Sequence, residues 1–130
     1  MRNTYNFAEL SGRVLIAVLF LMGGIGKLGA GYAGTQGYMQ SQGVPGALLP
    51  LVIALEIGGA ALIIAGLWTR LTALALAGFT IAAAVLFHAN FADQVQMILF
   101  MKNFAIAGGF LILVAHGAGA WSVDARRAGA

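Results

Sequence analysis

The sequence contains no cysteine, and only 8% of its 130 residues carry a charge. The absence of cysteine excludes intrachain disulfides, thiolate metal ligands and thiol redox chemistry. A water-soluble domain has about 25% charged residues, so this chain has too few charges to cover a core in water. The basic residues are scattered and the net charge is only +3, so nothing in the charge pattern indicates nucleic acid.

Apolar residues dominate what remains. They make up 61% of the chain, and the mean hydropathy is +0.92. Long apolar stretches predict transmembrane helices at about 8–28, 47–67, 71–88 and 95–115, because twenty-one helical residues cover roughly the 30 Å of a hydrocarbon core. The backbone must satisfy its own hydrogen bonds in lipid. We therefore predict an all-α membrane protein, a four-transmembrane-helix bundle forming a single domain over 1–130.

The ends and connections of these stretches predict a topology. The first stretch runs into glycines and further membrane segments, so we interpret it as a transmembrane helix that also serves as an uncleaved targeting signal. Residues 29–46 are polar, aromatic or small and uncharged, which predicts an interfacial loop with a short helix around 33–41. One side of the four-span path carries the arginines Arg2, Arg13, Arg70, Arg126 and Arg127. The other side has only Lys27 and Lys102, so the positive-inside rule predicts that both termini are cytoplasmic.

Glu56 is the most unusual residue of the second span. It is the tenth residue of that span, so it is expected near the middle of the membrane, where a charge is expensive. One interpretation is a buried ion pair that joins two helices. The other is a carboxylate that handles protons or anchors a ligand, since burial disfavours its charged form. The sequence leaves both open.

Depth along the helices indicates which side chains can surround Glu56. By helix rise, Lys102 is expected about 10–12 Å deep in the membrane, measured from the side away from the cytoplasm. Glu56 is expected only slightly deeper, so Lys102 is the first choice of partner. Lys27, at the end of the first span, is the second. His88 ends the third span near the same level, so the hypothesis is a ligand-binding pocket of Glu56, Lys102, His88 and Lys27, opening away from the cytoplasm. Tyr32 and Tyr38 are expected to cap it.

Two further polar residues are assigned structural roles. Asn103 points about 100° around its helix from Lys102, so it is expected to bond a different neighbour. Arg13 is about one turn inside the first span. We expect it to pair with Glu9 or to extend to lipid phosphates, not to take part in catalysis.

The two histidines do not predict a haem site. His88 and His116 are expected at opposite membrane faces, about 25–30 Å apart, so one haem cannot join them within a chain. A zinc site lacks three clustered ligands. No hydrolase triad, phosphate loop or paired-carboxylate motif is present, so no catalytic residue is predicted.

Glycines are concentrated within the spans. Small residues let membrane helices approach closely, so we predict helix packing at these positions. They are Gly23, Gly24, Gly26, Gly58, Gly59, Gly108 and Gly109.

Several separated motifs resemble the DoxX family of membrane proteins. They are residues 20–28 (FLMGGIGKL), 55–59 (LEIGG), 66–71 (GLWTRL), 100–109 (FMKNFAIAGG) and 121–124 (WSVD). The motifs occur in the same order as in the family, and the resemblance extends from about residue 10 to 124. The resemblance implies a small four-helix inner-membrane protein of bacteria. The family name comes from a subunit of a thiosulfate:quinone oxidoreductase, and some relatives are linked to redox complexes, but the resemblance carries no catalytic residues.

Three functions are consistent with these observations. The first is an accessory or anchoring subunit of a membrane redox system, with a protein partner. The second is a redox subunit that binds a quinone or another small ligand around Glu56. The third is a small transporter or channel, which needs a homo-oligomer because four helices make a thin pore. An enzyme activity of the chain alone is not indicated; at most it is a subunit of an oxidoreductase.

Overall fold

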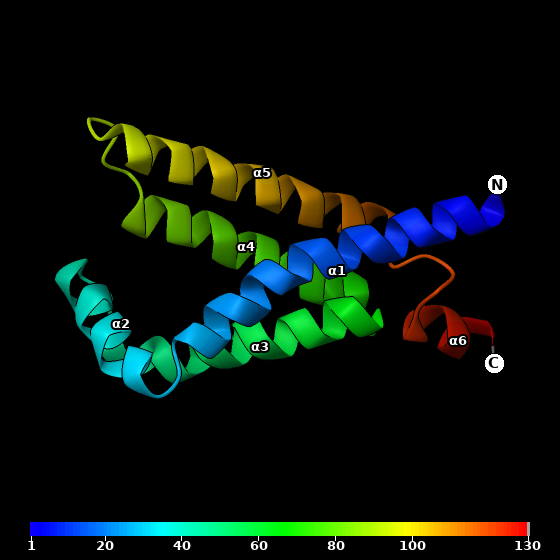
Figure 1. Ribbon diagram of the computed structural model, residues 1–130, viewed down its shortest axis with the longest axis horizontal. Helices are drawn as coiled ribbons and strands as arrows, with labels where there is room; N and C mark the ends of the chain where they lie inside the picture. Colours follow the sequence, from blue (N-terminus) through cyan, green and yellow to red (C-terminus); the bar gives the residue numbers. More distant parts are fainter. Residues whose placement is uncertain (130) are drawn as a thin grey trace.

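The computed structural model describes residues 1–129, and four of its helices are long and apolar enough to cross a membrane. These are α1 (Arg2–Gly26), α3 (Leu49–Ala65), which continues the short 3-10 helix η1 (Gly46–Leu48), α4 (Thr69–Phe87) and α5 (Gln94–His116). They alternate in direction along the long axis (Figure 1). The predicted four-helix bundle is confirmed.

The helix boundaries differ from the prediction mainly at the first helix. α1 starts at Arg2 and has 25 residues, which makes it about 37 Å long and longer than the hydrocarbon core. Its polar first turns therefore extend toward the headgroups. α3 begins with Pro50 in its first turn and ends at Gly66, whose φ is 70°. That left-handed conformation favours glycine and stops the helix.

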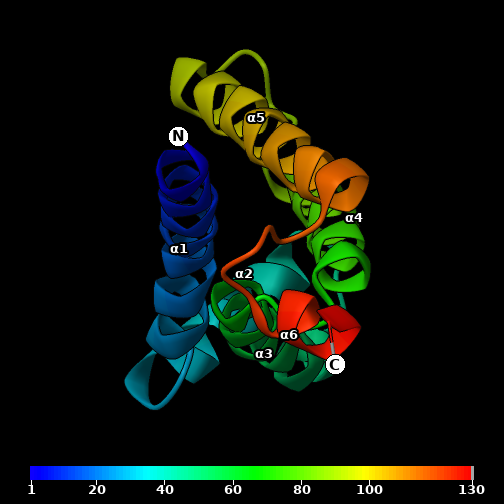
Figure 2. The same cartoon turned by 90° about the vertical axis from the view of Figure 1, so that its right-hand side faces the viewer.

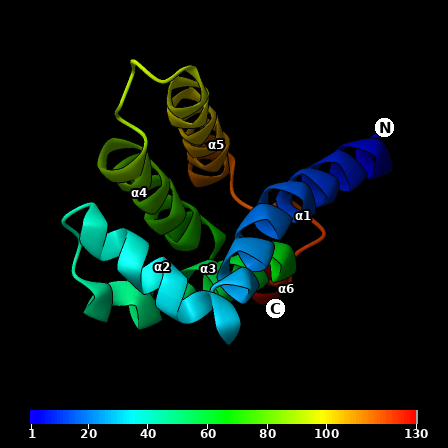
Figure 3. The same cartoon turned by 60° about the vertical axis from the view of Figure 1, so that its left-hand side comes forward.

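Two short helices lie outside the spans. α2 (Ala30–Ser41) replaces the expected interfacial helix and begins three residues earlier than predicted. It crosses the end of the bundle beside η1 and the start of α3 (Figure 3). α6 (Val123–Gly129) lies at the opposite end of the long axis, the end where α1 begins (Figure 1). We call the end with α2 and the α4–α5 connection the loop end, and the end with both chain termini the terminal end.

The helices pack as two pairs joined in the middle. α1 packs on α3 and α4 packs on α5, while α3 and α4 connect the two pairs. Viewed along the axis, the four helices form an arc in which α1 and α5 are the two outer members (Figure 2). The core lies at the middle of the arc and is formed by Ala17, Phe20, Ala60, Ile63, Ala73, Leu76, Ala77, Ala107 and Phe110. There α1 and α5 meet through large side chains: the rings of Phe20 and Phe110 pack edge to face with centroids 5.4 Å apart.

Candidate functional site

A cavity of about 470 Å³ lies on the loop-end side of the core. Helices α1, α3, α4 and α5 form its walls, and α2 covers part of it. All four residues of the predicted ligand site, Glu56, Lys102, His88 and Lys27, line this cavity. We call it the polar pocket. These four residues come from four different segments of the chain and meet at one cavity.

Glu56 forms its ion pair with Lys27. Lys27 Nζ lies 2.7 Å from Glu56 Oε1, and Glu56 is only 6% exposed. Lys27 Nζ also donates to the carbonyl of Gly23, 3.2 Å away. Within residues 1–129, Lys102 has no carboxylate within ion-pair distance. The first choice of partner, Lys102, was therefore wrong, and the second, Lys27, is the one found.

The physical reason is which helices are neighbours. α5 packs on α4 and not on α3, so Lys102 lies across the pocket from Glu56. Lys27 directly follows α1, and α1 approaches α3 closely at two glycines. A Cβ added at Gly24 would lie 2.6 Å from Ile57 Cγ1, and one at Gly23 would lie 3.1 Å from Glu56 Oε2. Helical side chains lean back toward the N-terminus. The ammonium of Lys27 therefore lies beside Gly23, one turn earlier in α1, and there it reaches Glu56 of α3.

Two further polar side chains of the pocket, His88 and Asn103, are hydrogen-bonded to neighbours. His88 Nδ1 lies 3.0 Å from Gln96 Oε1; if Nδ1 carries the proton, Nε2 is left as an acceptor. Asn103 Nδ2 donates to the carbonyl of Thr80 at 3.2 Å, so the expectation that Asn103 bonds a neighbour other than Glu56 is confirmed. These contacts fix the orientation of His88 and Asn103.

The cap of the pocket comes from α2. Tyr38 lines the pocket and stacks on Phe87 with ring centroids 5.4 Å apart. Thr35 and Met39 line the pocket beside it, whereas Tyr32 does not. The prediction of a tyrosine cap therefore holds for Tyr38 only.

The predicted packing glycines divide into two groups. Gly23 and Gly24 let α1 approach α3, Gly59 contacts Leu76, and Gly109 faces Ile16. A Cβ at Gly26, Gly58 or Gly108 would meet open space. Close packing within residues 1–129 is therefore not the role of those three glycines.

Arg13 has a role that the sequence reasoning missed. It is only 1% exposed, and its guanidinium donates to the carbonyls of Ile63 (3.0 Å), Ile64 (3.1 Å) and Trp121. It thus donates to carbonyls in the last turn of α3, where the helix leaves carbonyls without its own donors; the carbonyl of Ile63 also accepts from the N–H of Gly66. The expectation that Arg13 pairs with Glu9 or extends to lipid was wrong, because the end of α3 and the tail enclose it.

Asp124 completes this contact between the tail and the bundle. Its carboxylate accepts hydrogen bonds from the backbone N–H groups of Trp68 (2.7 Å) and Thr69 (2.9 Å), and its own N–H donates to the carbonyl of Gly66 at 2.8 Å. It thereby caps the N-terminus of α4. Burial by itself raises the pKa of Asp124, but the bonds from Thr69 and Trp68 and the charge of Arg127 outweigh it and hold the pKa below its ordinary value of about 3.8.

We call Arg13, Trp121, Asp124 and the α3–α4 turn the terminal clasp. The clasp joins two of the motifs noted in the sequence, 66–71 (GLWTRL) and 121–124 (WSVD), through the hydrogen bonds of Asp124. The signal in the sequence was an arginine lying deeper in an apolar run than an interfacial anchor needs.

The histidines lie far apart, as expected. His88 contacts Gln96, and His116 follows Gln96 by twenty residues of the same helix, which is about 30 Å. No group of three or more His, Cys, Asp or Glu side chains suited to a metal ion occurs in the described part of the chain.

Comparison with known proteins agrees with this architecture. The DoxX family model matches residues 8–89. The chain is 52% identical over 124 residues to Inner membrane protein YqjF of Escherichia coli K12, a match that covers 95% of each chain. It is 38% identical over 124 residues to Inner membrane protein YphA of the same organism, covering 90% of this chain and 88% of the relative. No solved structure matches it significantly.

Proposed function

Because the chain belongs to the DoxX family and is an inner membrane protein, we propose that it binds a small amphipathic ligand in the polar pocket, as a subunit of a membrane redox system. A quinone is the ligand class that fits both the pocket and the redox association. The observation that carries the proposal is Lys102, which lines the pocket without an acidic partner in residues 1–129.

The charges of the pocket favour a ligand with acceptor oxygens. Among the described lining residues, Lys27 and Lys102 are basic and Glu56 alone is acidic. The Lys27–Glu56 pair neutralises itself, so Lys102 leaves one surplus positive charge. An ammonium is a strong hydrogen-bond donor, and in a membrane it is stable only with a partner or water. A ligand carbonyl, hydroxylate or carboxylate supplies that partner.

The apolar walls favour a ligand with a lipid-like body. Leu19, Phe20, Val52, Phe79 and Ile106 are among the residues that line the pocket. Ligand sites typically combine such apolar walls with a few placed polar groups, in cavities of about 300–1,000 Å³. The polar pocket has that composition and size.

The direction of access follows from the predicted topology. With both termini cytoplasmic, the loop end faces away from the cytoplasm, and the ligand enters there beside α2. The buried rings of Phe20 and Phe110 fill the centre of the bundle. They block a continuous path through one chain, so a transporter or channel is the least supported of the three functions. An anchoring role alone does not require the polar pocket.

A titration tests the proposal. The protein in lipid nanodiscs is titrated with a short-chain ubiquinone by calorimetry, together with Lys102→Met and the matched control Arg126→Met, which removes a positive charge outside the pocket. We expect saturable binding that weakens about tenfold in Lys102→Met, the value of one charge-assisted hydrogen bond. Binding that is equal in all three proteins, or absent from the wild type, contradicts a quinone in this pocket.

A further inference from the structure

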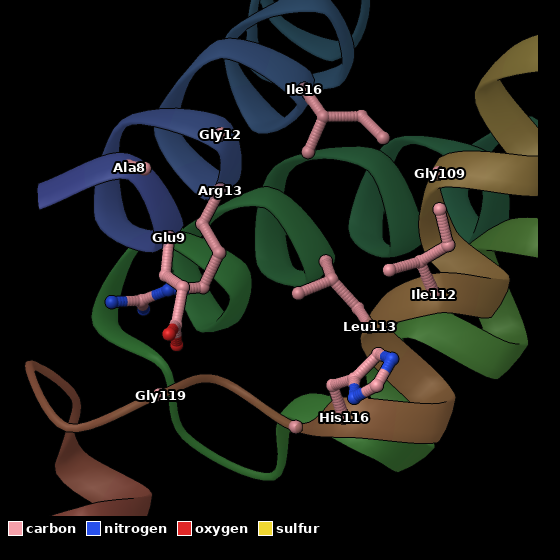
Figure 4. Close-up of a pocket in the computed structure, with 11 residues that line it drawn as sticks. Ala8, Glu9, Gly12, Arg13, Ile16, Gly109, Ile112, Leu113, His116 and Gly119 are labelled. Atoms are coloured by element: carbon pink, nitrogen blue, oxygen red, sulfur yellow. The ribbon is translucent and has the colours of Figure 1, made fainter. Parts of the chain in front are cut away.

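A second cavity, of about 620 Å³, lies at the terminal end between α1 and α5. Its residues are Ala8, Glu9, Gly12, Arg13, Ile16, Gly109, Ile112, Leu113, His116, Gly117 and Gly119. Figure 4 shows Ile16 of α1 and the side chains of Ile112, Leu113 and His116 of α5 around this cavity. We call it the seam cavity. It is separate from the polar pocket, since none of the described residues lines both.

We propose that the seam cavity binds one phospholipid with an ethanolamine headgroup. The first reason is its position. α1 and α5 are the outer helices of the arc (Figure 2), so the space between them opens to the bilayer. Lipid chains fill such a space where protein side chains do not, and Ile16, Ile112 and Leu113 give them an apolar wall.

The second reason is the charge pattern at the polar edge of the cavity. Glu9 is exposed, and no basic side chain of residues 1–129 lies within ion-pair distance of it. The charge of Arg13, which lines the same cavity, acts on Glu9 from farther away, while the guanidinium donates to backbone carbonyls. Its carboxylate is held against Gly119, where any Cβ would collide with it. A primary ammonium donates hydrogen bonds to such a carboxylate, whereas the quaternary ammonium of choline has no N–H to donate.

The third reason is a cation in the cleft that adjoins the seam cavity. Arg70 lies against Gly117, where an added Cβ would be 3.2 Å from Arg70 Nε. Gly117 and His116 line both the seam cavity and the adjoining cleft that contains Arg70. A guanidinium is well suited to a phosphate. Glu9 in the seam cavity and Arg70 in the adjoining cleft therefore match a headgroup that carries both an ammonium and a phosphate.

Native mass spectrometry tests this. The protein is exchanged into vesicles with equal amounts of phosphatidylethanolamine, phosphatidylcholine and phosphatidylglycerol, and the lipids that stay bound are counted. We expect one phosphatidylethanolamine per chain, retained about tenfold over phosphatidylcholine, with the preference lost in Glu9→Gln. Asp93→Asn is the matched control, because it removes a negative charge at the loop end and should keep the preference. Free phosphoethanolamine should not displace the lipid, since it lacks the chains.

A second variant separates lipid loss from misfolding. A Cβ at Gly12 meets open space, so the side chain of Gly12→Leu can enter the seam cavity without displacing its neighbours. We expect this variant to lose the bound lipid while its unfolding temperature stays unchanged. Equal retention of phosphatidylethanolamine and phosphatidylcholine by the wild type overturns the proposal. So does a lipid-free dimer, in which a second copy fills the seam.

Discussion

Charged side chains enter the bundle at both ends, but they have different partners there. At the terminal end, Arg13 is enclosed, and its two terminal guanidinium nitrogens donate to backbone carbonyls of α3 and the tail. At the loop end, Lys27 is paired with Glu56, and Lys102 faces a cavity. A charge whose hydrogen bonds are used by the backbone stabilises the fold. A charge that faces a cavity is available to a ligand. Membrane-embedded charge alone does not distinguish the two roles; the partners do.

The largest expected effect comes from the terminal clasp. Replacing Arg13 by Met removes the guanidinium bonds to the carbonyls of Ile63, Ile64 and Trp121, of which Ile63 keeps its bond from the N–H of Gly66. This should lower the free energy of unfolding by about 3 kcal/mol, since hydrogen bonds to charged groups contribute roughly 1.5–3 kcal/mol and unsatisfied buried groups add a penalty. The measurement is unfolding in detergent micelles. Arg13→Lys should recover little, because one ammonium cannot reproduce the planar guanidinium.

The control for that comparison is an exposed arginine. Arg2→Met removes the same charge from the same helix, but Arg2 is exposed. Its effect should stay within about 0.5 kcal/mol. Equal losses for Arg13→Met and Arg2→Met mean that the clasp does not stabilise the bundle.

The next effect concerns the contact that forms the polar pocket. In Gly24→Ala the new Cβ comes 2.6 Å from Ile57 Cγ1 and 3.3 Å from the Ile57 backbone nitrogen. α1 must move away from α3, which should destabilise the protein by about 1–3 kcal/mol. Gly26→Ala, where the Cβ meets open space, should be neutral or slightly stabilising because alanine favours helix. Thermal unfolding of the two variants side by side measures the difference. Similar values for both contradict the close crossing at Gly24.

A smaller effect depends on pH. The pKa of Asp124 is lowered in the folded protein, so its contribution to stability is fully present above about 3.8, its ordinary value, and is lost as pH falls through the lower folded-state pKa. Asp124→Asn should cost about 1 kcal/mol at neutral pH, the value typical of a helix cap. The wild type should lose that advantage over the variant in acid. A difference that does not change with pH means that the carboxylate charge is not what caps α4.

The four membrane spans and the residues of the polar pocket could be predicted from the sequence, because both depend on properties of single segments. Hydropathy and length predict the four spans, because lipid admits only long apolar helices. Alternating directions then place His88, Lys27, Glu56 and Lys102 on one side of the core, which is why the pocket residues were identified together. α1 begins earlier than predicted because its first turn lies outside the hydrocarbon, where hydropathy carries no signal.

What could not be predicted depends on which helices are neighbours. Topology along the chain does not say that α5 packs on α4 rather than α3, so Lys102 was preferred to Lys27 as the partner of Glu56. The enclosure of Arg13 required the path of residues 117–122 across the terminal end, where Gly117 and Gly119 have φ values of 79° and 86°. These are contacts between distant segments, and periodicity does not encode them.

The most direct test of the difference between the two ends compares Lys102→Met with Arg13→Met in two assays. The protein is purified from its own membranes, its small molecules are extracted and identified by mass spectrometry, and its unfolding is measured in parallel. We expect Lys102→Met to unfold like the wild type, within about 0.5 kcal/mol, but to lose a bound amphipathic molecule that the wild type retains. A wild type that carries no such molecule contradicts this difference between the two ends, as does a Lys102→Met variant that keeps the molecule and loses stability as Arg13→Met does.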